Sequence, residues 1–254
     1  MDITNRTIFI VGATSGIGLE LARRFAAAGS TVIVGGRRTD LLDELAAEGF
    51  AAIPIDVTDP GSVARARDTV LRSHPGLDTI MTMAGVMLLE DLRDPAHFGA
   101  AEQTIDTNLL GTIRVIDAFT PHLIARGSGT IIPVSSGIGF LPFPPMPSYA
   151  ASKAGVHAYS EALRAQLAGT GVDVAELVPP AVATTPEHAR HNPRALELDG
   201  YVTEVMDLFQ TDPTPHEILV KGVLMNRWAE RDGTYDELVA QRSQALAVLL
   251  PGRQ

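Results

Sequence analysis

The chain has 254 residues, of which 45% are hydrophobic and 20% charged, and its formal net charge is −10. This composition is that of an ordinary globular protein. The chain is long enough to bury a sizeable core without covalent cross-links. The acidic balance argues against a general nucleic-acid binder, which needs a basic face. The absence of cysteine excludes disulfides, thiolate metal sites and cysteine nucleophiles.

No stretch of the sequence resembles a targeting or membrane segment. The first apolar run, residues 8–11, is too short for the core of a signal peptide. The longest late run, residues 246–250, is far below the roughly 20 residues that span a bilayer. We therefore expect a cytoplasmic protein with no membrane or nucleic-acid partner.

The first half of the chain alternates short apolar runs with longer amphipathic ones. We predict strands at residues 7–11, 31–34, 52–55 and 77–81, and helices at residues 19–28, 40–47 and 62–73. The strand segments are continuously apolar rather than alternating, as a sheet covered on both faces requires. Strands separated by helices at this spacing predict βαβ crossovers and a parallel sheet.

The second half continues this pattern before it weakens. We predict a helix at 101–126 with a possible kink at Pro121, a strand at 130–134, a helix at 149–168 and a strand at 172–178. Residues 183–214 are rich in Pro, Thr, His and Asn, which predicts a long substrate-covering loop with short helices. Residues 215–231 are predicted as a helix, and the tail after Gly233 is open between a strand at 235–239 and a continued helix. No repeat or linker interrupts the chain, so we predict one α/β domain over residues 1–254, a doubly wound parallel sheet with helices on both faces.

A glycine-rich turn joins the first predicted strand to the first helix. Residues 12–18 read Gly-Ala-Thr-Ser-Gly-Ile-Gly. Glycine allows a tight turn and close approach to a phosphate, and the following helix N-terminus offers free N–H groups to it. The spacing differs from the G-x-G-x-x-G dinucleotide fingerprint and from a Walker A loop. Its position favours a phosphate-binding loop over a ligand-free turn.

Two arginines follow the second predicted strand. An NAD-type site places an acidic residue here to bind the ribose 2′-hydroxyl, but this chain has Gly36 at that position, followed by Arg37 and Arg38. Arginine matches a phosphate in charge and in geometry. We therefore predict NADP(H) rather than NAD(H). Two solvated arginines at the start of a surface helix are the structural alternative.

Tyr149 and Lys153 open a predicted helix and share one of its faces, since they are four residues apart. Free tyrosine has a pKa near about 10, and a nearby ammonium lowers that pKa. The pair is thus suited to general acid/base catalysis, although it is also compatible with a surface pair. Lys153 is one of only two lysines in the chain, which favours the catalytic interpretation.

Two further polar residues stand out by their positions. Ser136 directly follows the predicted strand at 130–134, where parallel-sheet enzymes bind ligands, so we expect it to hydrogen-bond a substrate oxygen. A Ser–Ser turn is the alternative. Asn108 lies among apolar residues inside a predicted helix, where Asn is unfavourable. A role for its amide and a merely tolerated Asn are both open.

Together these motifs resemble the short-chain dehydrogenase/reductase superfamily, in its single-domain branch, over residues 5–185. The resemblance implies a Rossmann-like fold and a catalytic tetrad of Asn108, Ser136, Tyr149 and Lys153. It assigns cofactor contacts to the glycine motif, to the segments that follow the later strands and to the tetrad. These residues are Gly12, Thr14, Ser15, Gly16, Ile17, Gly18, Arg37, Arg38, Asp56, Val57, Ala84, Gly85, Tyr149, Lys153, Pro179, Val182 and Thr184.

The resemblance also implies a reaction, hydride transfer between nicotinamide C4 and a carbonyl or alcohol carbon. Tyr149 would donate the proton to the developing alkoxide, and Ser136 would hold that oxygen. Lys153 would bind the nicotinamide ribose and lower the Tyr149 pKa, while Asn108 would fix a helix bend and a proton-relaying water. The family commonly assembles through its two long helices, here 101–126 and 149–168, so we expect a homodimer or homotetramer.

The chain departs from the family pattern at three places. Thr82 and Met83 stand before Ala84-Gly85 where two asparagines are usual, so the local packing must differ. Pro180 follows Pro179 where glycine is usual, and the usual C-terminal strand ending in Val-Asp-Gly-Gly is missing. The double proline and altered tail resemble a sub-branch named for an oxidoreductase of D-alanylation operons. That name says little about the substrate.

The chemistry needs no metal, and the seven histidines show no H-E-x-x-H spacing, so His188 and His191 are interpreted as loop residues. Residues 139–147 are apolar and stiffened by proline. With Met87, Leu88 and residues 183–212 they would form an apolar pocket, although a subunit contact or a packed loop is equally open. We expect a bulky apolar ketone or alcohol as substrate.

Three functions therefore stay open. The first is an NADP(H)-dependent ketone or aldehyde reductase, or an alcohol dehydrogenase acting in reverse. The second is a nicotinamide-dependent epimerase or dehydratase on the same fold. The third is a non-catalytic NADP(H)-binding regulator. The intact Ser136, Tyr149 and Lys153 favour an enzyme, because a regulator needs no proton donor.

Overall fold

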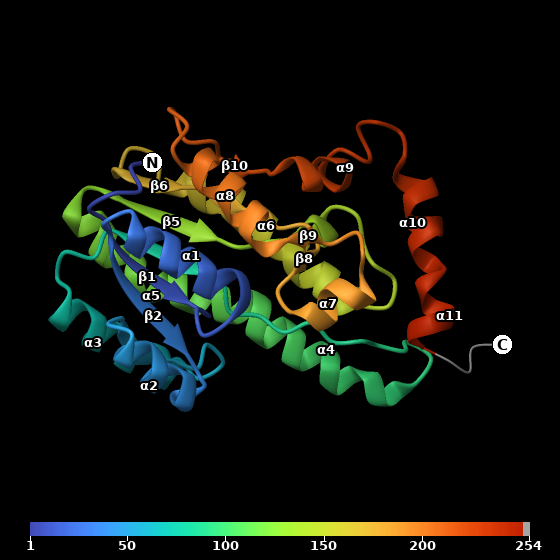
Figure 1. Ribbon diagram of the computed structural model, residues 1–254, viewed down its shortest axis with the longest axis horizontal. Helices are drawn as coiled ribbons and strands as arrows, with labels where there is room; N and C mark the ends of the chain where they lie inside the picture. Colours follow the sequence, from blue (N-terminus) through green and yellow to red (C-terminus); the bar gives the residue numbers. More distant parts are fainter. Residues whose placement is uncertain (251–254) are drawn as a thin grey trace.

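Six parallel strands form the sheet at the centre of the molecule, in the order β3-β2-β1-β4-β5-β6 (Figure 1). The computed structural model describes residues 1–250. The strands are β1 (Thr7–Val11), β2 (Thr31–Gly36), β3 (Ala51–Pro54), β4 (Thr79–Thr82), β5 (Gly129–Pro133) and β6 (Val172–Val174). The strand order reverses between β1 and β4, which defines a doubly wound dinucleotide-binding sheet and confirms the predicted fold class.

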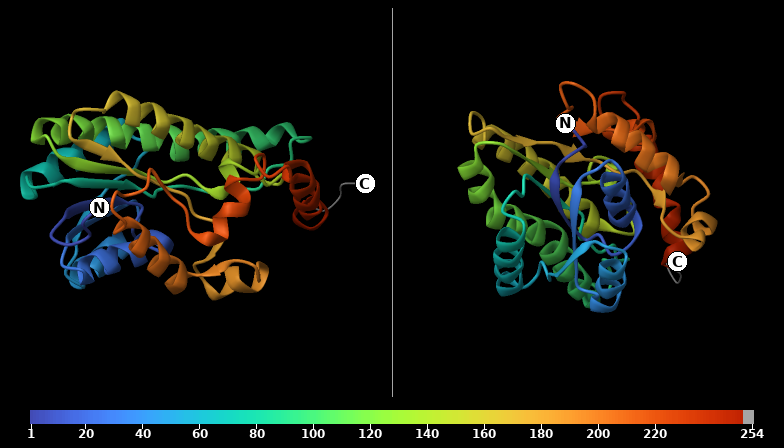
Figure 2. Two further views of the ribbon diagram at one scale, coloured as in Figure 1. Left: turned by 90° about the horizontal axis from the view of Figure 1, so that it is seen from above. Right: turned by 60° about the vertical axis from the view of Figure 1, so that its left-hand side comes forward.

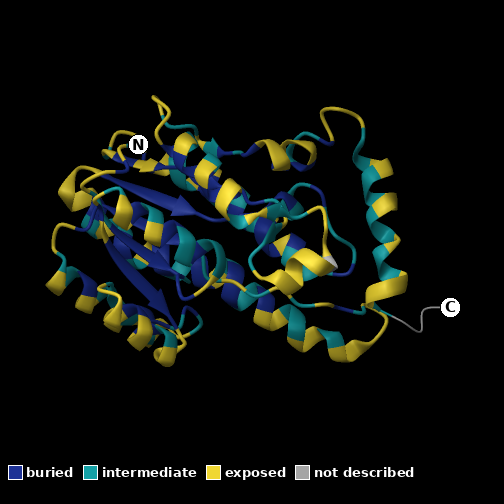
Figure 3. Ribbon diagram, in the orientation of Figure 1, coloured by how far each residue is buried: buried dark blue, intermediate teal, exposed yellow. Residues whose placement is uncertain are grey.

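Helices cover both faces of this sheet (Figure 2). The first layer contains α1 (Gly16–Ala27), α2 (Thr39–Ala47) and α8 (Leu198–Phe209), and the second contains α3 (Pro60–Ser73), α5 (Gly111–Arg126) and α6 (Pro147–Gln166). Ile8 and Ile10 of β1 pack toward the first layer, whereas Phe9 and Val11 pack toward the second. Figure 3 shows that the strands are buried, and because both faces of the sheet are covered, their residues are apolar at successive positions.

The predicted elements of the first half all form, and their ends have local causes. The helix predicted from residue 62 begins at Pro60, because Asp59 caps it by accepting a hydrogen bond from the Gly61 N–H at 2.8 Å. The helix predicted from residue 19 begins at Gly16, directly after the glycine-rich turn. The sequence pattern is sufficient to predict these elements, because each of them is determined by its own residues.

The long helix of the second half is irregular at an unexpected place. It runs through α4 (Phe98–Ile105), a π-helical segment η2 (Asp106–Leu110) and α5. The irregularity lies at η2 rather than at Pro121, through which α5 continues. Asn108 is the middle residue of η2, so the wider helical turn falls at the residue whose amide we expected to have a role.

The helix predicted over residues 215–231 is wrong. This segment contains β10 (Glu217–Ile218), a 3₁₀ turn η4 (Lys221–Val223) and the short helix α9 (Leu224–Arg227). The strand predicted over 172–178 is split, since β7 (Glu176–Leu177) pairs in parallel with β10 while Leu177 bridges to Val134 after β5. The pairing partner of β10 is distant in sequence, which a local pattern does not reveal.

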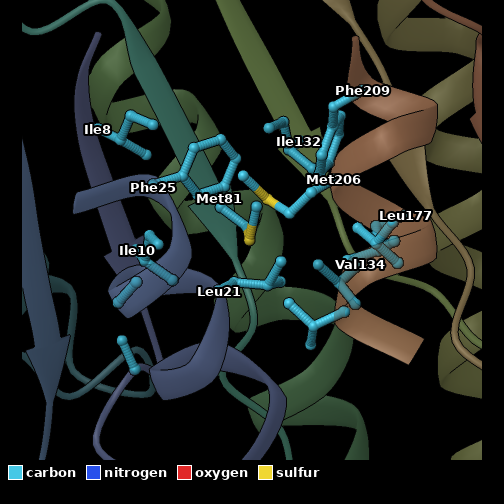
Figure 4. Packing of buried hydrophobic residues seen from close by; sticks show 14 of the residues in the cluster. Ile8, Ile10, Leu21, Phe25, Met81, Ile132, Val134, Leu177, Met206 and Phe209 are labelled. Atoms are coloured by element: carbon cyan, nitrogen blue, oxygen red, sulfur yellow. The ribbon is translucent and has the colours of Figure 1, made fainter. Parts of the chain in front are cut away.

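Residues 183–214 contain more regular structure than a loop with short helices. Strands β8 (Val182–Ala183) and β9 (Leu196–Glu197) pair around α7 (Pro186–His191), and the twelve-residue α8 follows. Five side chains of α8 are buried, and its Phe209 ring lies 5.9 Å from that of Phe25 in α1 (Figure 4). Helix α8 therefore belongs to the core, and only residues 182–197 remain as a predicted substrate cover.

The tail is helical rather than a strand. Helices α10 (Tyr235–Ser243) and α11 (Ala245–Leu249) lie at one end of the molecule, and neither buries a residue (Figure 1). The Arg242 guanidinium donates a hydrogen bond to the Leu141 carbonyl and so ties α10 to the chain before α6. Within residues 1–250, none of the helices has the length and apolar character needed to cross a membrane.

Candidate active site

A cavity of about 480 Å³ opens at the carboxyl ends of the central strands, which is where doubly wound sheets bind nucleotides. Most of the residues predicted to bind the cofactor line it. They are Gly12, Thr14, Ser15, Ile17, Gly18, Arg37, Arg38, Val57, Ala84, Gly85 and Thr184. The other predicted residues, Gly16, Asp56, Tyr149, Lys153, Pro179 and Val182, are not part of the lining. The cavity also contacts Met83 and Thr107, which the sequence did not indicate.

The glycine-rich turn packs too closely for side chains. A Cβ at Gly12, whose φ is +96°, would lie 2.4 Å from the Ala84 backbone nitrogen. A Cβ at Gly18 would lie 2.5 Å from the Gly12 carbonyl oxygen. The motif thus brings the turn against the chain that follows β4, with the N-terminus of α1 beside the cavity. This is a cradle into which the diphosphate of a dinucleotide fits.

The two arginines play different parts. The Arg38 guanidinium donates hydrogen bonds to the Thr14 and Ser15 hydroxyls, both at 2.7 Å, and so fastens the glycine-rich turn. Arg37 is exposed and lines the cavity. A Cβ at Gly36 would lie 2.6 Å from the Thr14 methyl group, so the acidic side chain of an NAD-type site would have to displace Thr14.

Asp56 is a fixed acceptor at the edge of the cavity, between the lining residues Ile55 and Val57. Its carboxylate accepts hydrogen bonds from the Thr58 N–H and hydroxyl, at 3.0 and 2.8 Å. Burial raises the pKa of Asp56, but the two bonds from Thr58 outweigh it and hold the pKa below its ordinary value. Asp56 is therefore ionised and held in place at neutral pH.

The four predicted catalytic residues come together beyond Gly85, at one end of this cavity. A Cβ at Gly85 would lie 3.1 Å from Asn108 Oδ1 and 3.9 Å from Lys153 Nζ. The side chains of Ser136 and Tyr149 are close enough for Ser136 to influence the pKa of the Tyr149 phenol. The Lys153 Nζ lies 5.8 Å from the centroid of the Tyr149 ring. Residues from β5, η2 and α6 thus meet beside the cavity.

The Asn108 amide joins three segments. Its Oδ1 accepts the Val86 N–H at 2.8 Å, and its Nδ2 donates to the Val86 carbonyl at 2.9 Å and to the Ser152 hydroxyl at 3.2 Å. These bonds tie η2 to the chain after β4 and to α6. The geometry favours a role for the amide over a merely tolerated Asn.

The pKa of Tyr149 departs from the expectation. Burial raises the pKa of Tyr149, and the hydrogen bond with Ser136 only partly offsets this, so the phenol is more strongly protonated than free tyrosine. We had expected Lys153 to lower it. Lys153 Nζ instead donates to the Val134 carbonyl at 2.8 Å. The Tyr149 phenol is therefore protonated at neutral pH.

The segment after β7 reaches both parts of the site. The Pro179 carbonyl accepts hydrogen bonds from the Gly137 N–H at 2.9 Å and the Ser136 hydroxyl at 3.4 Å. Further along, a Cβ at Gly16 would lie 3.3 Å from the Thr184 methyl group, and Val182 packs against the core of the first layer. The segment thus runs from the catalytic serine to the glycine-rich turn.

The two family departures after β4 have a packing consequence. Met83 Cγ lies 3.1 Å from the position of a Cβ at Gly18, so the Met83 side chain fills the space beside the start of α1. The Thr82 hydroxyl is buried without a hydrogen-bond partner. An apolar contact therefore stands where polar side chains are usual.

The predicted apolar pocket is only partly available to a substrate. The Phe140 ring lies 4.6 Å from the His157 ring and 4.6 Å from the Arg227 guanidinium, and Leu141 is fully buried. These two residues are packed within the protein. Met87, half exposed at 54%, and the partly buried Leu88 remain open to a ligand.

One group of potential metal-ligating atoms occurs among the described residues, from His157, Glu161 and Glu176, within 4.8 Å of one another. Each of these side chains already has protein partners, since Glu161 pairs with Arg164 and Glu176 accepts from His157. His188 hydrogen-bonds Thr184 at 2.9 Å, and the side chain of His191 lies outside the described part of the chain.

Glu90 is a buried residue beside the site that the sequence analysis did not indicate. Its buried carboxylate accepts the Ser148 N–H at 2.9 Å and the Ser148 hydroxyl at 2.8 Å, and His97 lies 3.3 Å away. Ser148 is in the first turn of α6, so Glu90 caps this helix from outside and faces its positive end. The residue that follows Ser148 is Tyr149. The only signal in the sequence is an acidic residue directly after the apolar residues 86–89.

The fold and the site define a dinucleotide-binding α/β oxidoreductase with a Ser-Tyr-Lys arrangement. The sequence pattern of the short chain dehydrogenase family matches residues 6–194. The uncharacterized oxidoreductase DltE of Bacillus subtilis is 32% identical over 208 residues, covering 80% of this chain and 82% of that protein. The chain therefore belongs to the short-chain dehydrogenase family, whose members bind nicotinamide cofactors.

Other relatives agree with this assignment. A sulfoacetaldehyde reductase of Chromohalobacter salexigens is 38% identical over 178 residues, 68% of this chain and 70% of that protein. A short-chain dehydrogenase from Streptomyces avermitilis superposes with a TM-score of 0.79 at 24% identity, over 96% of this chain and 99% of that one. One from Burkholderia cenocepacia, solved with NADP, gives 0.80 at 24%, over 94% and 99%. These two structures confirm the fold.

The Glu90 cap leads to a prediction. We expect Glu90→Gln to lower the free energy of unfolding by about 1–3 kcal/mol, because charge-assisted bonds to buried donors are replaced by weaker ones. The rate of turnover should fall as well, since the first turn of α6 positions Tyr149. Urea unfolding and steady-state kinetics measure the two effects. Glu102→Gln, at an exposed site on α4, should change neither, and equal behaviour of the two variants would contradict the role of the cap.

Proposed function

We propose that the protein is an NADP(H)-dependent oxidoreductase that interconverts an apolar ketone or aldehyde and its alcohol, with reduction as the favoured direction. The observation that carries this proposal is that Ser136, Tyr149 and Lys153 gather beside Gly85, at one end of the cavity lined by the glycine-rich turn. A proton donor beside a dinucleotide cradle is the minimum that carbonyl reduction requires.

The residues divide the chemistry among themselves. The nicotinamide cofactor, when bound, supplies the hydride that adds to the carbonyl carbon. The carbonyl π electrons then become a lone pair on oxygen, to which Tyr149 donates its phenolic proton. Ser136 holds that oxygen by a hydrogen bond, and Lys153 holds the cofactor ribose. The net change consumes one carbonyl compound, one reduced cofactor and one proton, and yields the alcohol and oxidised cofactor.

The protonation of Tyr149 supports the direction. Because burial raises the Tyr149 pKa, the phenol is protonated at neutral pH and ready to donate. Oxidation of an alcohol would need the phenolate as a base, which this environment disfavours. The relative from C. salexigens is a sulfoacetaldehyde reductase, which agrees with reduction as the favoured direction.

The cofactor preference rests on charge and space. Arg37 is free to reach a 2′-phosphate at the rim of the cavity, and Arg38 holds the turn beneath it. An acidic side chain at position 36 would have to displace Thr14, which disfavours the usual ribose-binding carboxylate of NAD sites. Both features favour NADP(H).

The first prediction for this function concerns the proton donor. Tyr149→Phe should lower kcat by about 100-fold or more, the usual contribution of a general acid, while NADPH binding is retained. NADPH consumption against a panel of ketones and aldehydes measures turnover, and NADPH fluorescence measures binding. Tyr159→Phe is the matched control, because Tyr159 lies on the same helix as Tyr149 but its hydroxyl donates to Asp117 of α5 at 3.1 Å.

The outcomes separate the candidate functions. Full turnover by Tyr149→Phe would contradict the proposal. Product formation without net NADPH consumption would indicate an epimerase or dehydratase. Tight NADPH binding with no turnover of any class would favour a regulator. Preferred turnover of small charged aldehydes would replace the apolar substrate with one like that named for the sulfoacetaldehyde reductases.

A second prediction concerns cofactor choice. Arg37→Ala should weaken NADPH binding by about tenfold or more, since a charge-assisted hydrogen bond contributes about 1.5–3 kcal/mol. NADH binding should change little, because NADH lacks the 2′-phosphate. Arg23→Ala, on the outer face of α1 where Arg23 pairs with Glu48, is the control. Tighter binding of NADH than of NADPH by the wild-type protein would overturn the preference.

We also propose assembly into a homodimer or homotetramer through the long helices. Phe98 on α4 is 60% exposed, and Leu110 on η2 and Ile124 on α5 are each 42% exposed, which is typical of a surface that another subunit covers. Sedimentation velocity should show a dimer or larger species that Ile124→Glu shifts toward monomer. A wild-type protein that is monomeric at all concentrations would contradict this assembly.

A further inference from the structure

The ammonium group of Lys153 poses an electrostatic problem. Only 4% of the residue is exposed, and its Nζ donates to one backbone carbonyl, that of Val134. Across residues 1–250, no carboxylate lies within ion-pair distance of Nζ. A buried cation without a nearby negative charge is expensive, and a lysine in that situation loses its proton. Some group must therefore compensate the charge.

Glu176 on β7 is the carboxylate placed to do so. Its side chain is fully buried, accepts a hydrogen bond from the Ser135 hydroxyl, and accepts another from His157 Nδ1 at 2.8 Å. Ser135 directly follows Val134, whose carbonyl binds Lys153. His157 is one turn beyond Lys153 on α6. The Glu176 carboxylate and the Lys153 ammonium thus bind the neighbouring residues Ser135 and Val134. On α6, the Glu176 partner His157 lies one turn from Lys153.

The other charges near Glu176 are already balanced by their own partners. Glu217 on β10 accepts two hydrogen bonds from the Arg227 guanidinium, at 2.7 and 3.0 Å. Glu161 on α6 pairs with Arg164 at 2.5 Å. His157 faces Glu176 and lies 4.0 Å from Glu217. Among the charged groups packed around this site, only Lys153 and His157 remain to balance Glu176.

We propose that Glu176 is a positioning residue that serves as the buried counter-charge of Lys153 and keeps it an ammonium ion for binding the cofactor ribose. The consequence for catalysis rests on the proposed function, whereas the electrostatic coupling does not. His157 fixes the carboxylate from the side that faces solvent, where its own side chain is 24% exposed.

The electrostatic environment of the two basic groups agrees with this geometry. Burial lowers the pKa of Lys153 to about 8, and the charge of Glu176 opposes that decrease. The hydrogen bond to Glu176 raises the pKa of His157. When His157 is protonated at lower pH it shares the Glu176 charge with Lys153. As pH rises and His157 becomes neutral, Lys153 is the remaining cation for that carboxylate.

The test uses the fact that the chain has only two lysines, Lys153 and Lys221. Protein labelled with ¹³C at the lysine Cε gives two signals in a proton–carbon spectrum, and exposed Lys221 is the internal reference. The titration is carried out on cofactor-free protein. We expect Glu176→Gln to lower the Lys153 midpoint by about one pH unit, as loss of a nearby opposite charge does. The Lys221 midpoint should not change.

Two further variants separate charge from shape. Glu176→Asp keeps the charge and should leave the Lys153 midpoint near that of the wild type, although it is shorter. Glu217→Gln removes the neighbouring carboxylate that Arg227 already balances, and should also leave it unchanged. Equal midpoints in the wild type and Glu176→Gln would overturn the proposal. So would a fall in Glu176→Asp as large as in Glu176→Gln, which would mark a purely structural role.

The titration midpoint of Lys153 in the wild-type protein also tests the proposal, and this test does not require any variant to fold. Buried lysines without a counter-charge titrate at about pH 5–6. A Lys153 midpoint above about 7 supports a counter-charge, and one below it overturns the proposal. Because the spectra need neither cofactor nor substrate, failure of the proposed function would leave this result intact. In active enzyme, Glu176→Gln should shift the alkaline limb of kcat/KM to lower pH by the same amount.

Discussion

The burial of one ammonium group constrains much of this structure. A Cβ at Gly139 would lie 2.8 Å from the Lys153 carbonyl carbon, so η3 (Gly137–Gly139) packs directly on the backbone of α6. A Cβ at Gly85 would lie 3.9 Å from the Lys153 Nζ, and the Val134 carbonyl accepts a hydrogen bond from that Nζ. These close contacts exclude water from a charged group. They are tolerable only because charge and hydrogen bonds from β5, β7 and α6 replace the lost hydration.

The sequence predicts best what its local segments determine. The strands of the first half and the glycine-rich turn follow from apolar runs and from residues 12–18, whose close packing against Ala84 needs glycine. Arg37 and Arg38 were recognisable because an acidic residue is missing at Gly36. The convergence of Ser136 with Tyr149 was not a product of spacing, however. It came from resemblance to a family, since the two residues meet only when β5 and α6 pack together.

The features that the sequence did not predict depend on distant partners. The sequence pattern does not reveal β10 within residues 215–231, because this strand is two residues long and is held by pairing with β7. Helix α8 is not predicted because residues 183–214 have the composition of a loop. Its apolar face becomes recognisable only where it packs against α1. The π-helical turn at Asn108 depends on bonds to Val86 and Ser152 from other elements. A local pattern carries no record of such contacts.

The two halves of the site are therefore built on different physics. The half that a cofactor would occupy consists of backbone positions where side chains do not fit, so a short motif encodes it. The chemical half consists of buried charges supplied by several elements, such as Glu90 beneath the first turn of α6 and Glu176 beside Lys153. The carboxylate of Glu176 among the apolar residues 174–178 signals that a buried partner must exist, but not which one. Variation among members of this family in direction, pH range and substrate is accordingly to be sought in these supporting charges rather than in the motifs that identify the fold.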